Sequence, residues 1–197
     1  MPLTTYTAGE VLTAASLNAN FSFAASGAGL TFITGTTFTT ATSVSLPDNT
    51  FTSTYQNYKL FLSLTALTAD ADFTLRLRAS GADDTSLVYD NMFMGITRGG
   101  VANNAVSSAA STVSLGENDS ANAGRYSLFL DFVSPQLALP TSIFGCYNFT
   151  DKGFTTQVNR TGGAIFRNAT VFDSATFISS VASSLTGSYK VYGYANS

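Results

Sequence analysis

The feature that most constrains this fold is a long series of short segments rich in β-branched and aromatic residues, each ended by turn-forming residues. Residues 58–64 carry large apolar side chains at the even positions, with Phe61 interrupting the other face, and residues 73–78 alternate strictly between apolar and polar. Alternation of this kind places one set of side chains on each face of a strand. With no long amphipathic helix between the segments, the chain is predicted to be all-β, an antiparallel jelly-roll-like sandwich.

The predicted strands cover most of the chain beyond residue 30. They are expected at 31–34, 42–46, 58–64, 73–78, 87–96, 106–115, 126–133, 142–149, 155–158, 164–166, 176–178 and 188–194. Turns are expected where Gly, Pro, Asn and Asp cluster, at 47–49, 81–84, 99–100, 116–119, 151–153 and 162–163. We therefore expect one β-sandwich domain over 30–197, preceded by a separate segment over 1–29.

One short helix is predicted near the start of the chain. Thr13 is a suitable N-cap for a helix over 14–20, and Leu17 and Phe21 would share one face of it at a spacing of four residues. A helix of about two turns is marginal in isolation. We therefore expect it to need a surface on which to dock.

The sequence has apolar residues for a core but few charges. Apolar residues make up 45% of the chain and charged residues 11%, against about 25% charged in typical soluble domains. A surface of hydroxyls and amides repels neighbouring molecules little, which suits a protein packed against copies of itself or against other subunits. The alternative is a soluble β-sandwich whose surface is polar but uncharged.

The residue types from which active sites are built are nearly absent. There is no histidine, so His-dependent acid–base or nucleophilic catalysis is excluded. Most carboxylates fall in predicted turns; Asp131, inside the apolar run 128–132, is the one acid that a strand might bury. We expect it to be an outward residue or an ion-pair partner. No catalytic residue or cofactor is therefore expected. No metal is expected either, because the acidic residues at 70–72 and 83–84 lack the spacing of a calcium loop.

Other features limit the partners. The nine Lys and Arg residues are scattered singly, so nucleic-acid binding is not expected. No apolar run approaches the length of about 20 residues that a membrane span needs. The start lacks a signal peptide, which predicts synthesis in a cytoplasm. Cys146, the single cysteine, is expected to be a small buried apolar residue.

Residues 7–21 resemble the N-terminal segment of bacteriophage tail-fibre and related virion proteins, in which the pattern G-x-x-L-T-A-x-x-L-N-x-x-F precedes the fibre or receptor-facing domain. Here the pattern falls on Gly9, Leu12, Thr13, Ala14, Leu17, Asn18 and Phe21. More loosely, residues 55–60, 75–81 and 187–194 look like phage jelly-roll modules.

This resemblance implies a non-enzymatic subunit of a phage tail or neck fibre, located in the virion, homotrimeric and in contact with other tail, neck or capsid proteins. The docking residues would be Leu12, Thr13, Ala14, Leu17, Asn18 and Phe21. Alternatives are a capsid decoration or cement protein, a module that binds a host surface glycan through residues near 89–91 or 99–104, and a carbohydrate-active enzyme acting through Asp131.

Overall fold

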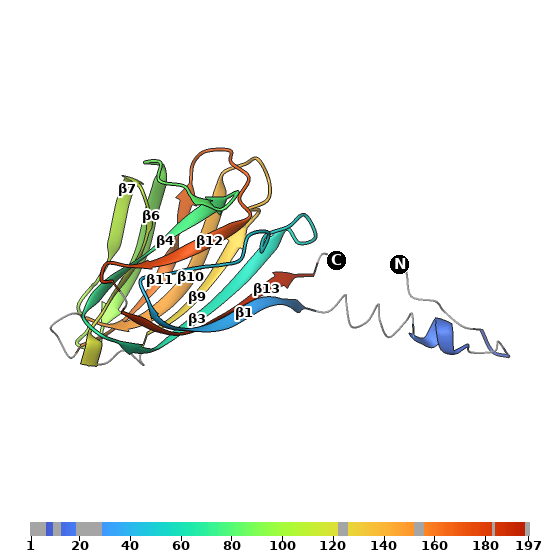
Figure 1. Cartoon of the computed structure of the whole chain (residues 1–197), viewed down its shortest axis with the longest axis horizontal. Coiled ribbons are helices and arrows are strands. Elements are labelled where there is room, and N and C mark those ends of the chain that lie inside the picture. The colour runs from blue at the N-terminus through green and yellow to red at the C-terminus, as the bar shows by residue number, and fades with distance from the viewer. Residues whose placement is uncertain are drawn as a thin grey trace.

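The computed structural model describes residues 7–9, 13–18, 29–121, 126–151, 156–182 and 184–195. The chain is all-β and forms two antiparallel sheets arranged as a sandwich, as the sequence predicts (Figure 1). The large sheet has the strand order β1 (Leu30–Ala41), β13 (Leu185–Tyr194), β3 (Asn57–Leu67), β9 (Ser127–Val133), β10 (Thr141–Thr150), β11 (Gln157–Phe166), β6 (Tyr89–Thr97) and β7 (Ala105–Ala110). The small sheet consists of β2 (Ser43–Ser45), β12 (Ser174–Ser179) and β4 (Ala71–Ala79), with β5 (Ala82–Asp83) and β8 (Val113–Asn118) both paired to β4.

The core lies between the two sheets and is built by the alternation seen in the sequence. The even-numbered side chains of 58–64 and the odd-numbered side chains of 73–78 are buried. Tyrosines are also buried there, and their hydroxyls have partners: Tyr126 donates to the carbonyl of Leu115 at 3.0 Å, and Tyr89 accepts from the amide of Leu77 at 3.0 Å. Buried tyrosines need such partners for their polar end.

The predicted single strand over 106–115 is wrong, because the structure divides it between the sheets. β7 ends at Ala110 in the large sheet and β8 begins at Val113 in the small one. Asn91 of β6 holds the crossing: its amide nitrogen donates to the carbonyl of Thr112 at 3.0 Å, and its amide oxygen accepts from the backbone of Ser114 at 3.1 Å. The crossing at residues 111–112 contains no Gly, Pro, Asn or Asp, so the sequence did not predict a break there.

The turn predicted at 162–163 is also wrong, because both glycines lie inside β11, which replaces the two strands expected there. A Cβ on Gly162 would lie 2.1 Å from the carbonyl oxygen of Met92, and one on Gly163 would lie 2.5 Å from that of Ile143. The glycines allow β6 and β10 to approach β11 closely.

Two other predicted connections are strands. The Thr-rich stretch after residue 34 belongs to β1, with register shifts after Phe32 and Phe38. Residues 116–118 lie in β8, where Gly116 has a φ of 83° next to a register shift. Bulges of this kind carry the turn-like residues that suggested a chain reversal. The predicted turn at 151–153 lies mostly outside the described residues.

Residues 14–18 are helical, which confirms this part of the helix predicted over 14–20; residues 19–20 lie outside the described residues. The hydroxyl of Thr13 accepts from the amide of Ser16 at 3.2 Å, and the carbonyl of Thr13 accepts from the amide of Leu17 at 3.0 Å. Thr13 therefore caps this turn. Leu12 and Phe21, also expected to dock, lie outside the described residues.

Candidate functional site

The large sheet exposes many large apolar side chains on the face directed away from the core. Eight of them have exposed fractions between 37% and 70% and define what we call the outer face: Phe32, Met92, Met94, Ile96, Val106, Phe129, Phe144 and Ile165. Single exposed apolar residues are common on proteins, but a contiguous group marks an interaction site. The outer face is therefore the candidate functional site.

An aromatic row crosses one half of this face. The row runs from Phe32 of β1 through Tyr192 of β13 and Phe61 of β3 to Phe129 of β9. Each ring contacts the next one edge to face, and the three centroid distances along the row are 5.6, 5.6 and 5.3 Å. Such pairs each contribute about 0.5–1.5 kcal/mol beyond the burial of area. The row holds these four rings in fixed positions and so presents a rigid apolar surface.

A shallow groove of about 1040 Å³ continues from the row across β9, β10, β11, β6 and β7. The residues that line this groove include Phe129, Phe144, Ile165, Met92 and Val106. The ring of Phe144 lies on the backbone of the neighbouring strand, because Gly163 has no side chain to displace it; a Cβ there would be 2.9 Å from the ring. The groove is thus mainly apolar, and backbone forms part of its floor.

The ion pair of Lys59 and Asp131 borders the groove. The ammonium of Lys59 lies 2.8 Å from a carboxylate oxygen of Asp131, which also accepts a hydrogen bond from the hydroxyl of Tyr194. Burial lowers the pKa of Lys59, but its hydrogen bonds with Asp131 and Tyr194 outweigh burial, so the pKa is raised above 10.5. The expectation that Asp131 is outward and ion-paired is confirmed.

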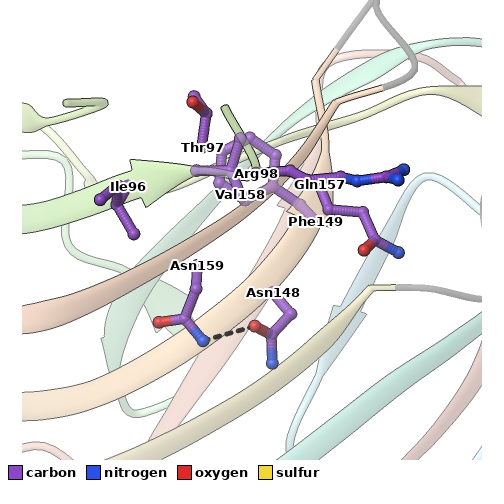
Figure 2. A pocket seen from close by; sticks show the side chains of 8 residues that line it. All are labelled: Ile96, Thr97, Arg98, Asn148, Phe149, Gln157, Val158 and Asn159. Carbon is purple, nitrogen blue, oxygen red and sulfur yellow. Dashed lines mark hydrogen bonds between the residues drawn. The ribbon is translucent and has the colours of Figure 1, made fainter. Parts of the chain in front are cut away.

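A second, smaller pocket of about 390 Å³ lies at the end of β6, β10 and β11. Figure 2 shows the amides of Asn148 and Asn159 facing each other, where the nitrogen of Asn159 donates to the oxygen of Asn148 at 2.6 Å. Ile96, Arg98 and Gln157 are among its other lining residues. The pocket therefore combines amide, guanidinium and apolar groups.

Several of the residues expected to bind a glycan have partners within the protein, whereas residues 99–102 are exposed. Tyr89 and Asn91 are buried and hydrogen bonded within the sandwich. The side chain of Asn103 accepts from the guanidinium of Arg160 at 2.8 Å, and that of Asn104 accepts from the amide of Gly95 at 3.2 Å.

Cys146 was expected to be buried, and this is wrong. It is half-buried and lies on the outer side of β10, directly opposite Phe129 of β9 and Thr161 of β11. Ile143 and Tyr147 of the same strand face inward, so the alternation of β10 turns the thiol of Cys146 toward the groove, which it lines.

The structure places four of the expected docking residues together on one turn. Thr13, Ala14, Leu17 and Asn18 lie within 13–18, and the side chain of Leu17 is 36% exposed. A single helical turn is too small to bury the side chain of Leu17 by itself. This part of the prediction stays a prediction, because no contact surface for these residues is described.

Among the described residues there is no group of three or more His, Cys, Asp or Glu side chains placed to hold a metal ion. In the same residues, no helix has the length and apolar character needed to cross a membrane. Comparison with protein-family models, with curated proteins and with solved structures finds no match for the chain.

Sequence reasoning missed the outer face. Its signal was present in β6, where Met92, Met94 and Ile96 alternate with the inward-facing Asn91 and Phe93, so that apolar residues occur on both faces of the strand. The same pattern is expected for a strand that is buried on both faces inside one protein, so it does not identify an exposed apolar face.

Proposed function

We propose that this chain is a non-enzymatic structural subunit of a bacteriophage particle, a tail or neck fibre subunit that docks through residues 1–29 and projects the β-sandwich. The observation that carries the proposal is the phage-like pattern over 9–21, within which Thr13 caps a helical turn that exposes Leu17. Burying one leucine is worth about 1.5–3 kcal/mol, so a socket on another virion protein would gain from receiving it.

The composition of the sandwich supports the same proposal. A chain with 11% charged residues and a broad apolar outer face is suited to a crowded assembly in which subunits cover one another. Copies of this chain, as a homotrimer, and other tail, neck or capsid proteins are the partners we propose.

The docking test uses particles assembled with variants of this chain. Leu17→Asp places a charge in the proposed contact, and we expect at least a tenfold loss of the chain from purified particles, measured by quantitative mass spectrometry. Ala15→Asp adds the same charge on the same exposed turn and should incorporate nearly as well as the wild type. Deleting residues 1–25 should abolish incorporation.

Normal incorporation of both Leu17→Asp and the deletion would show that docking does not use this segment. A circular dichroism spectrum of each purified variant checks that the sandwich is still folded. Locating the chain in an electron-microscopy map of the particle then distinguishes a fibre subunit from a capsid decoration protein.

A second candidate function, host-glycan binding, is favoured by the pocket in Figure 2. Amides such as Asn148 and Asn159 both donate and accept hydrogen bonds, as recognition of sugar hydroxyls requires. A glycan array tests this: wild-type binding that Asn159→Ala removes would support it, and signals at background would exclude it. Asn168→Ala, outside the pocket, is the control.

A further inference from the structure

The outer face is large enough to be a protein interface. Its eight side chains are exposed by about half on average, which at roughly 200 Å² for a large side chain amounts to about 800 Å². The largest apolar patch on a monomer is typically about 300–600 Å², and a stable interface buries about 800 Å² per partner. The outer face is therefore larger than the typical apolar patch of a monomer, and its area matches what one partner buries in a stable interface.

Its side chains are those that interfaces favour. Aromatic residues and methionine are enriched in the buried centres of interfaces. Here Phe129 and Phe144 come from β9 and β10, and Met92 and Met94 from β6. Methionine adapts its shape to a partner, while the ring contacts hold the aromatic part rigid.

The charges around the groove favour a second copy of the chain. The charged residues that line it are Lys59, Asp131 and Asp90, and each has an opposite charge nearby: Lys59 and Asp131 pair with each other, and Asp90 lies 3.2 Å from Arg167. Lys190 adds one positive charge beside the aromatic row. A nearly neutral face does not repel its own copy, and it offers a strongly charged partner little to attract it.

We propose that copies of this chain associate through the outer face, with the groove buried between subunits and Cys146 inside the buried area. The inference rests on the self-association part of the proposed function and names the surface that carries it. It is tested on the purified full chain, so its failure is distinguishable from a failure of docking, which is measured on particles.

The first measurement is the mass of the purified chain by sedimentation equilibrium over a wide concentration range. We expect an oligomer for the wild type, and dissociation at least tenfold easier for Met94→Lys, because the variant would bury a charge at the interface. Leu139→Lys changes a side chain of similar exposure in the connection between β9 and β10, and it should associate like the wild type. Val106→Lys, on the edge strand β7, replaces Met94→Lys if that variant does not fold.

The second measurement uses the thiol of Cys146 as a reporter at the groove. In the wild-type oligomer we expect its reaction with a maleimide to be slowed at least tenfold relative to the Met94→Lys monomer. A wild-type chain that stays monomeric at all concentrations would overturn the proposal. So would an oligomer that survives Met94→Lys and Val106→Lys with Cys146 fully reactive, because it would use another surface.

Discussion

Lys59 and Asp131 face each other across β3 and β9, with the lysine ammonium 2.8 Å from the carboxylate. Asp131 is the one acid that lies inside an apolar run of the sequence. The structure places it on the outward side of β9, as expected, where Lys59 and the hydroxyl of Tyr194 satisfy its oxygens. A carboxylate held in this way has a structural role that needs no reaction to explain it.

Asp131→Asn should lower the free energy of unfolding by about 1 kcal/mol, because it removes a partly buried ion pair in which the side chains are 22% and 33% exposed. Urea denaturation measures this. Asp48→Asn is the control: Asp48 lies 3.6 Å from Arg78 and is 54% exposed, so its effect should stay below about 0.5 kcal/mol. A polysaccharide-degrading activity that disappears in Asp131→Asn would overturn the non-enzymatic proposal.

Stability should fall at alkaline pH. Burial raises the pKa of Tyr126 well above 10.0, and burial raises the pKa of Tyr147 against the opposing effect of Arg160. The folded state therefore holds these protons more tightly than the unfolded state does. The stabilisation is complete below pH 10 and is lost as the pH rises through the folded-state pKa values. Denaturation midpoints from pH 7 to 12 should be flat at first and then drop.

Tyrosinate absorbance followed during the same titration provides the check. We expect part of the tyrosine signal to appear only together with the loss of β-structure. If all nine tyrosines ionise near pH 10 while the protein stays folded, the buried positions are not protected as described.

Gly163→Ala should destabilise the sandwich by about 1–3 kcal/mol, since its Cβ would lie 2.5 Å from the carbonyl oxygen of Ile143 and 2.9 Å from the ring of Phe144. Thermal unfolding measures the loss. The control is Gly99→Ala in an exposed turn, where the nearest atom would be 3.8 Å away and little change is expected. Equal melting temperatures for the two variants would contradict the close approach at β11.

Asn91→Ala should cost about 3 kcal/mol, because it leaves the carbonyl of Thr112 and the amide of Ser114 without their partner where the chain passes between sheets. Chemical denaturation of the variant measures this cost. Asn148→Ala, which removes an exposed amide pair with Asn159, should change stability by less than about 0.5 kcal/mol. A similar small effect for Asn91→Ala would mean that the crossing is held by other contacts.

The strands whose two faces differ were predictable from sequence. In β3 and β4 the alternation of residues 58–64 and 73–78 identified the buried side chains, because each strand has a core on one side only. In four places the structure differs from the prediction, for one physical reason. The crossing at 111–112, the glycines of β11, the bulge at Gly116 and the long β1 each depend on a neighbouring strand that is distant in sequence.

The candidate site was less predictable than the fold. A strand such as β6 is apolar on both faces, and its sequence does not say whether another sheet or another molecule covers the second face. The capped turn at Thr13 was predictable because the N-cap signal is local. Cys146 was misplaced because its neighbours Phe144 and Tyr147 are both large and apolar, although only Tyr147 points into the core.

The pairing of Leu30 with Tyr194 brings the beginning of β1 and the end of β13 to the same corner of the sandwich. Figure 1 shows both strands running along the long axis of the protein toward that corner. A pulling force that arrives through the residues before Leu30 therefore acts along β1, at right angles to its hydrogen bonds with β13. Those bonds resist as a group, in shear, instead of opening one after another. If residues 1–29 dock as proposed, they would load β1 along its length, the direction in which its hydrogen bonds with β13 resist together.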